Sequence, residues 1–587
     1  MWLDHWVAAC LVPVAVWILL SGLDDLFIDL AFLLTGRKQF RWPADAELDE
    51  APERRIAILV PLWREHGIIG HMLERNLATI RYENYHVFAG VYPNDDLTAR
   101  AVGEKARRHP RVHLAMCPHG GPTSKGDCLN SIYRRMADYE VRHGIRFEIV
   151  VVHDAEDLVH RESLRLINWF SRRYEMVQVP VLPLATGRGE FTHGIYCDEF
   201  AEYQSKDIPV RQRLGGFLPS NGVGTGFERA ALERLDEAYQ GRVFDPECLT
   251  EDYETGFRLH AMGCRQVFVP IRFDAAGAVA TREYFPRTFR AAVRQRSRWV
   301  AGITLQGWQR HGWRGPWPQP YWLWRDRKGL VGNLLSPAAN LLSLYCAASY
   351  ARNAWNGESW HLGSHIPPWL ARVFVATLAI SIVQAAERTL AGARIYGWRF
   401  AAAAPLRILW GNVVNCAATV AALRQFLAAR VQHHALVWRK TEHVYPRPRL
   451  GEVLVRMNQV SMGELEEVAR KVPEGLRIGE YLVQLQKISE EHLYQALSFQ
   501  TGIPWGLPAG EEVNRLATRA FPAQTARRWK VMPYRVVAGQ LHVVTAEVPS
   551  EEMTRELASL SALEIRFRLV RPREFEELAG EYLPRRE

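Results

Sequence analysis

The sequence predicts an α/β domain held on a membrane by a few apolar helices and followed by a smaller α+β domain. Three observations lead to this class. Short apolar runs alternate with polar helical segments in the centre of the chain, separate apolar stretches are long enough to cross a bilayer, and the C-terminal quarter contains an internal repeat. With 587 residues, 48% of them hydrophobic and 23% charged, the chain exceeds one domain and is neither disordered nor collagen-like.

Charge and cysteine usage narrow the possible partners. The net charge of +9 favours nucleic acid, anionic lipid or a phosphorylated ligand without choosing among them. The eight cysteines form no CxxC pair, so we expect buried thiols in a reducing compartment rather than a zinc cage or a disulfide framework.

Three stretches approach the ~20 residues that cross a hydrocarbon core. They are residues 7–23, 330–350 and 369–386. No Lys or Arg precedes the first, whereas Arg37 and Lys38 follow it and Lys328 precedes the second. The positive-inside rule then places the N-terminus outside and both large polar regions in the cytoplasm. Residues 408–427 fit an interfacial amphipathic helix, but would put the C-terminal region outside if they crossed the membrane.

The central region predicts a parallel sheet covered by helices. Its expected strands are residues 56–60, 86–91 and 148–152. Ligands of such sheets bind at the C-terminal strand ends, where Glu65, Asp95, Asp154 and Glu156 lie. Converging carboxylates repel unless a cation lies among them, so these oxygens favour Mg²⁺ or Mn²⁺ bridging a diphosphate. The alternative is that they are solvated loop residues.

Four further segments are candidates for the same site. Lys125 beside a glycine suits a phosphate or sugar oxygen, and the Gly-rich residues 221–229 predict a turn that enters a helix. Asp252 fits a general base, or an early-turn acid that complements a helix dipole. Residues 295–299 lie on a basic helix, where Trp and Arg also serve as membrane anchors.

As a set, these residues resemble the "D, DxD, TED, QxxRW" signature of membrane-bound family 2 glycosyltransferases, such as cellulose, chitin and hyaluronan synthases. The matching residues are Asp95, Asp154-Ala155-Glu156, Thr250-Glu251-Asp252 and Gln295…Arg298-Trp299. The resemblance covers about residues 50–310. It implies a GT-A fold, inversion at the anomeric carbon and a nucleotide-diphosphate sugar donor, for which UDP-N-acetylhexosamine follows from the chitin and hyaluronan relatives. Glu156 replaces the usual Asp, and Asp157 is an alternative ligand.

The resemblance also implies a role for each matching residue. The implied donor-binding residues are Glu65, Asp95, Lys125, Asp154, Gln295 and Arg298. Asp154 and Glu156 would hold the metal. Asp252, beside Glu251, would deprotonate the acceptor, and Trp299 would stack on it. That acceptor would be a growing glycan or a lipid-linked sugar.

The segment that begins Arg449-Leu450-Gly451 recurs as Arg477-Ile478-Gly479. A duplicated helical hairpin that only packs is one interpretation. The repeat also resembles the MshE-type N-domain of type II secretion ATPases over about residues 445–580, which implies cyclic di-GMP as an allosteric activator. The implied ligand contacts are Arg449, Leu450, Gly451, Arg477, Ile478, Gly479 and Gln500. Asn458 and Gln486 stand where that motif has glycine.

The expected domains are an N-terminal membrane helix (1–36), the transferase domain (50–328), two membrane helices (329–390), interfacial helices and a linker (391–440), and the MshE-type domain (445–587). This order resembles bacterial multi-pass inner-membrane proteins of phage adsorption, which act with an outer-membrane export or receptor partner. It implies a processive transferase that builds a secreted exopolysaccharide, and no nucleic-acid partner. Two rivals are a single-sugar transferase acting on a lipid carrier and a catalytically weak, cyclic di-GMP-sensing scaffold for an outer-membrane phage receptor.

Overall fold

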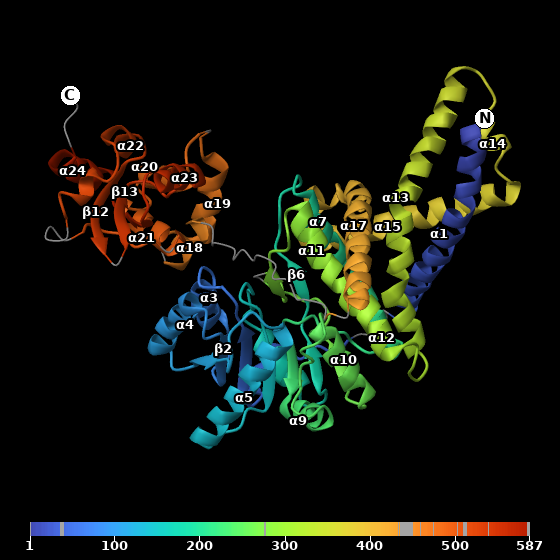
Figure 1. The fold of residues 1–587 in the computed structure, drawn as a ribbon, viewed down its shortest axis with the longest axis horizontal. Coiled ribbons are helices and arrows are strands. Elements are labelled where there is room, and N and C mark those ends of the chain that lie inside the picture. The colour runs from blue at the N-terminus through green and yellow to red at the C-terminus, as the bar shows by residue number, and fades with distance from the viewer. Residues whose placement is uncertain are drawn as a thin grey trace. The chain divides into compact units, whose positions relative to one another are not determined.

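The computed structural model divides the chain into two compact units, Met1–Tyr445 and Pro446–Glu587, which are described separately (Figure 1). The residues described are 2–35, 40–274, 277–432, 434, 450–457, 459–473, 475–501, 503–508, 513–537 and 539–583.

The first unit is built on a seven-stranded sheet with the order β3-β2-β1-β4-β7-β5-β8. Its strands are β1 (Ile56–Pro61), β2 (Tyr85–Val91), β3 (Val112–Met116), β4 (Ile149–Val152), β5 (Met176–Gln178), β7 (Thr225–Glu228) and β8 (Gln266–Phe268). The three predicted strands are confirmed as β1, β2 and β4. The expectation of a purely parallel sheet is wrong, because β7 runs antiparallel to both β4 and β5. The Gly-rich turn therefore leads into a strand before helix α9 (Arg229–Ala238), not directly into a helix.

Both faces of the sheet are buried, as the continuous apolar runs require. Along β1, Ile56, Ile58 and Val60 belong to one apolar cluster, whereas Ala57 and Leu59 belong to the other. Two short pairs flank the sheet: β6 (Val181–Pro183) with β11 (Thr281–Glu283), and β9 (Phe273–Asp274) with β10 (Gly277–Ala278). The helices of this part are α2 (Asp45–Glu50), α3 (Ile69–Thr79), α4 (Asp96–Arg108), α5 (Lys125–His143), α6 (Ser163–Phe170), α7 (Phe191–Glu202), α8 (Ile208–Arg213), α10 (Glu251–Ala261), α11 (Phe289–Trp299), α12 (Gly307–His311) and two π-helices, η1 (Tyr203–Asp207) and η2 (Val300–Gln306).

Four described helices are long and apolar enough to cross a membrane, one more than the three predicted spans. They are α1 (Trp2–Thr35), α13 (Gln319–Trp355), α15 (Pro368–Tyr396) and α17 (Ala404–Val431), with short α14 (His361–Ser364) and α16 (Trp398–Ala401) between them. Helices α1 and α13 run antiparallel, since Tyr345 donates to Asp4 near one end and Lys328 contacts Asp24 near the other. The aspartates of α1 lie within one continuous helix, and two of them, Asp24 and Asp25, have basic partners on α13.

The additional candidate, α17, packs along the α/β domain as well as against α13 (Figure 1). The Arg407 guanidinium forms a buried ion pair with Asp198 of α7 at 2.6 Å. Further along, Asn415 accepts from Arg296 of α11 at 2.6 Å. One face of α17 is therefore polar and occupied by the α/β domain.

The second unit consists of a helical part and a small sheet. The helices are α18 (Leu450–Arg456), α19 (Met462–Lys471), α20 (Ile478–Gln484), α21 (Glu490–Thr501), α22 (Ala523–Arg528), α23 (Glu551–Ser559) and α24 (Pro572–Tyr582), with a 3₁₀ turn at Ala517–Arg519. The sheet has the order β12-β13-β14. Its strands are β12 (Val531–Val537), β13 (Gln540–Thr545) and β14 (Glu564–Leu569). The predicted α/β class of the first unit and α+β class of the second are confirmed.

The repeat folds as two helix pairs. Ser461 caps α19 by accepting from the amide of Glu464, whose carboxylate accepts from the amide of Ser461. Gln486, which replaces a motif glycine, adopts the left-handed φ of 54° that glycine favours. Arg449, Asn458 and the linker between the two units lie outside the described residues.

Candidate active site

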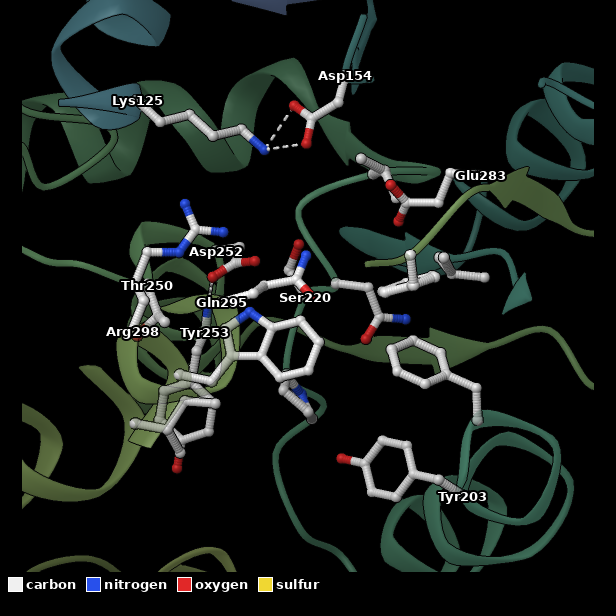
Figure 2. A pocket seen from close by; sticks show the side chains of 18 of the residues that line it. Lys125, Asp154, Tyr203, Ser220, Thr250, Asp252, Tyr253, Glu283, Gln295 and Arg298 are labelled. Carbon is white, nitrogen blue, oxygen red and sulfur yellow. Dashed lines mark hydrogen bonds and ion pairs between the residues drawn. The ribbon is translucent and has the colours of Figure 1, made fainter. Parts of the chain in front are cut away.

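A cavity of about 630 Å³ opens beyond the C-terminal ends of β1 and β4 (Figure 2). Most of the predicted site residues line it, although they come from segments far apart in the sequence. These are Glu65, Lys125, Asp154, Glu156, Asp252, Gln295, Arg298 and Trp299. Asp95 and Glu251 are not among the lining residues.

The Lys125 ammonium is the electrostatic centre of this cavity. At the first residue of α5, Lys125 contacts the Asp154 carboxylate at 2.7 Å and approaches Glu251 to 3.9 Å. Burial alone would lower the pKa of Lys125, but the carboxylates of Asp154, Glu251 and Asp252 raise it above its usual value. Lysine therefore stays charged here and compensates part of the negative charge.

Backbone geometry brings the Gly-rich turn against this cluster. The Gly222 carbonyl accepts from Lys125 at 3.4 Å. Gly222 has a φ of +74°, and a Cβ there would lie 2.6 Å from Oδ2 of Asp252. Only glycine allows this turn to approach Asp252 so closely.

Asp252 and Glu251 form the first turn of α10, where the helix N-terminus favours negative charge. The Oδ1 atom of Asp252 accepts from the Tyr253 amide at 2.8 Å. Burial raises the pKa of Asp252, although Lys125 opposes this shift. Burial and the neighbouring Asp252 raise the pKa of Glu251 to about 7. A carboxylate with a raised pKa, facing a cavity, is suited to accept a proton near neutral pH.

Asp95 has a different position from the one expected for a ligand-facing residue. Its carboxylate caps α4 by accepting from the Thr98 amide at 3.4 Å, and accepts from the Arg64 amide at 2.6 Å. Arg64 adopts a φ of 55°, and the adjacent Glu65 lines the cavity. Asp95 thus holds the loop that presents Glu65.

The predicted metal ligands lie together at the end of β4. Asp154 and Glu156 both line the cavity, whereas Asp157 is fully buried. Asp157 accepts from the Asp154 amide at 3.0 Å and contacts His153 at 2.7 Å, so it supports the loop instead of facing the cavity. Among the described residues, no three His, Cys, Asp or Glu side chains are arranged to hold a metal. Two carboxylates still fit Mg²⁺ or Mn²⁺, because Mg²⁺ usually takes its other ligands from phosphate and water.

Two polar atoms of α11 are left for a ligand. Oε1 of Gln295 and Nε of Arg298 are buried and have no hydrogen-bond partner within the described part of the chain. Both residues line the cavity beside Asp252, as Figure 2 shows. Trp299 follows them and packs edge-on against Tyr196 at 6.0 Å. Buried polar groups without partners are uncommon and often mark ligand sites.

Sequence reasoning missed the membrane side of the cavity. Additional walls come from the π-helix η1 and from three membrane helices. These residues are Asp25, Tyr203, Lys206, Asp207, Arg325, Asp326, Gln384 and Arg388. The sequence does contain one indication of this wall, because charged residues interrupt the apolar segments. Ionisable residues within membrane helices usually serve a function.

In the second unit, several of the residues predicted to contact cyclic di-GMP lie within the described part of the chain. Arg477 precedes α20 and is exposed, whereas Gly479 is buried. Leu450 packs at the edge of the apolar cluster, and a Cβ at Gly479 would lie 2.7 Å from it. Gly451 packs in the same way against Leu465. Both repeat glycines thus have packing roles, and the structure leaves the ligand contacts as a prediction.

Comparison with known proteins identifies two domain families. Residues 52–302 match the family described as "Glycosyltransferase like family 2", and residues 501–587 match the MshEN domain. Both predicted resemblances are confirmed. The repeat at residues 449–500 precedes the MshEN match.

Curated relatives match almost the whole chain. Bacteriophage adsorption protein B of Escherichia coli (strain K12) is 36% identical over 569 residues, which cover 91% of this chain and 76% of that protein. Bacteriophage N4 adsorption protein B of Escherichia coli O157:H7 matches with the same identity and coverage.

Two solved structures are also similar. A structure of MshE with cdg is 26% identical and covers 23% of this chain and 99% of its own, with a TM-score of 0.22. The mannosyltransferase PcManGT from Pyrobaculum calidifontis, in complex with GDP-Man and Mn²⁺, is 19% identical and covers 70% of this chain and 99% of its own, with a TM-score of 0.40.

Replacing Gly222 with alanine should destabilise the protein. The new Cβ would clash with Asp252 and would require a left-handed backbone, which costs about 1–3 kcal/mol. We expect a lower thermal midpoint in detergent. Gly187→Ala is the matched control, because no heavy atom lies within 4 Å of a Cβ there and its φ is ordinary. Equal midpoints for the two variants would show that the Gly222 contact is relaxed in solution.

Proposed function

Because this chain belongs to the family of bacteriophage adsorption protein B and carries a family 2 glycosyltransferase domain, we propose that it transfers a sugar from a nucleotide-diphosphate donor, with inversion, to an acceptor hydroxyl. The observation that carries the proposal is the convergence of Lys125, Asp154, Asp252 and Arg298 on one cavity. Such a displacement needs a carboxylate for the attacking hydroxyl and cations for the leaving diphosphate.

Different residues of the chain accept the proton and bind the leaving group. Asp252 accepts the proton of the acceptor hydroxyl while the hydroxyl oxygen attacks the anomeric carbon, and the bond from that carbon to the diphosphate oxygen breaks. The raised pKa of Asp252 makes it a stronger base than an ordinary aspartate. Arg298, whose buried Nε has no hydrogen-bond partner among the residues described, binds the departing diphosphate.

Asp154 and Glu156 would hold Mg²⁺ or Mn²⁺, which when bound supplies positive charge to the leaving group. Lys125 keeps Asp154 oriented toward this position through its contact at 2.7 Å. On the donor side, Glu65 faces the nucleoside and Asp95 fixes the loop that carries it.

Trp299 provides the surface on which an acceptor sugar stacks. Its ring is held by Tyr196, Phe200 and Phe285, with ring centroids 6.0–6.4 Å away. We propose a growing glycan as the acceptor and UDP-N-acetylhexosamine as the donor, on the resemblance to chitin and hyaluronan synthases. The product would be an exopolysaccharide, exported with an outer-membrane partner.

The second unit would make this activity responsive to cyclic di-GMP. Support comes from the MshEN match and from the exposed guanidinium of Arg477 at the start of α20, which suits phosphate and guanine. The ligand would activate by binding more tightly to the active arrangement of the chain.

We further propose a bacterial inner-membrane location with α1, α13 and α15 as spans and with the transferase domain and the second unit in the cytoplasm. The polar contacts of α17 with α7 and α11 support an interfacial position for this helix rather than a fourth crossing.

Asp252→Asn should abolish sugar transfer while donor binding stays within about twofold of the wild type, because the amide cannot accept the proton. Nucleotide release and product mass from a donor panel measure transfer, and titration calorimetry measures donor binding. Full turnover by the variant would contradict the assignment. If the wild type releases no nucleotide from any donor, the scaffold interpretation gains support.

Cyclic di-GMP should bind the full-length protein, and Arg477→Ala or Arg449→Ala should weaken binding at least tenfold, which corresponds to about 1.4 kcal/mol. Arg519→Ala, an exposed arginine of the same unit, is the control and should bind like the wild type. Undetectable binding to the wild type would contradict the proposed regulation.

A reporter fused after residue 435 should read as cytoplasmic if three helices cross the membrane. Fusions in the loop between α13 and α15 should read as periplasmic and serve as the internal control. A periplasmic signal after residue 435 would mean that α17 crosses the membrane.

A further inference from the structure

A hydrogen bond connects the helix that carries Asp252 to a membrane helix. Tyr253 is the next residue on α10, and its hydroxyl donates to Oδ2 of Asp326 at 2.7 Å. Asp326 lies in the first part of α13, and both residues line the cavity. Neither residue belongs to the recognised signature.

The acceptor of this hydrogen bond is rigidly held. Arg211 binds the Asp326 carboxylate through both terminal nitrogens, at 2.7 and 2.9 Å, and its Nε donates to the Phe217 carbonyl at 2.7 Å. The guanidinium also stacks over the Phe217 ring at 4.2 Å. A bidentate pair in this setting fixes the plane of the carboxylate, so Asp326 is a fixed point for the tyrosine.

The aromatic ring of Tyr253 also packs against apolar neighbours. It lies edge-on to Phe217, with centroids 5.1 Å apart, and shares an apolar cluster with Leu323 of α13. The ring is 5% exposed. Loss of the hydroxyl would therefore keep the ring buried but release it from the fixed Asp326 carboxylate, so that Tyr253 and its backbone amide shift relative to α13.

We propose that the Tyr253 hydroxyl is a positioning group that aligns Asp252 from the membrane helix α13. The connection is direct, because Oδ1 of Asp252 accepts from the Tyr253 amide at 2.8 Å. A displacement of Tyr253 therefore moves the carboxylate that accepts the proton. This inference rests on the proposed role of Asp252, and it makes the first part of α13 part of the catalytic framework.

Tyr253→Phe tests the inference by deleting one oxygen. Small misplacements of a catalytic group cost up to about 100-fold in rate, so we expect kcat to fall about 10- to 100-fold. The KM for the donor and the thermal midpoint should follow those of the control Tyr82→Phe. That control also removes the hydroxyl of a buried tyrosine, which donates to the Arg54 carbonyl at 2.7 Å, and neither Tyr82 nor Arg54 lines the cavity.

The outcomes separate the inference from the proposed function. Wild-type turnover by Tyr253→Phe, or a fall in midpoint well beyond that of Tyr82→Phe, would overturn the positioning role. An inactive wild type would instead overturn the proposed function. Asp326→Asn should lower kcat less in the Tyr253→Phe background than in the wild type, since both changes break one connection. Independent, additive effects would contradict the inference.

Discussion

The candidate site depends on one ammonium group placed among three carboxylates. Asp154 follows β4, Glu251 and Asp252 open α10, and Lys125 opens α5, so three elements meet at one charge. Without that charge, the carboxylates would repel one another in a poorly solvated space. With it, the cluster still carries excess negative charge, which is why the proposed diphosphate donor would need Arg298 and a divalent cation. The approach of the Gly222 turn to Asp252 closes this arrangement from the other side.

Ion pairs also connect the transferase domain to the membrane helices. Lys206 of η1 contacts Asp29 of α1 at 2.5 Å and Glu387 of α15 at 2.6 Å. Asp207 accepts from Arg325 of α13 at 2.9 Å, and burial raises the pKa of Asp207 to about 6. Buried pairs contribute little net stability, but breaking one leaves an uncompensated charge. They therefore specify how the three helices align with η1, and this alignment shapes the membrane side of the cavity.

Much of the transferase fold was predictable, because strands that are buried on both faces consist of continuous apolar residues. β3 was missed, since His113 and Leu114 in Val112–Met116 break the run with partial exposure at the edge of the sheet. The positions of the signature residues could be predicted from the sequence, but the structural role of Asp95 could not. A carboxylate that binds Arg64 and caps α4 has the same sequence appearance as one that faces a ligand. For α17, apolarity was visible, whereas the partner of Arg407 lies 209 positions away. Such pairings depend on tertiary packing and leave no local pattern.

The two π-helices explain how distant motifs act as one surface. Each borders the cavity: η1 begins at Tyr203, and η2 begins directly after Trp299. The wider turn of a π-helix changes the direction of the side chains around it, and such turns often occur at functional sites. Within η2, a Cβ on Gly302 would lie 2.4 Å from Oγ1 of Thr250, the residue that starts α10. The helix that presents Gln295, Arg298 and Trp299 is thus in direct contact with the start of the helix that presents Asp252. The helix that carries the groups proposed to bind the leaving diphosphate therefore contacts the helix that carries the proposed base for the attacking hydroxyl. A larger residue at position 302 would push these two helices apart.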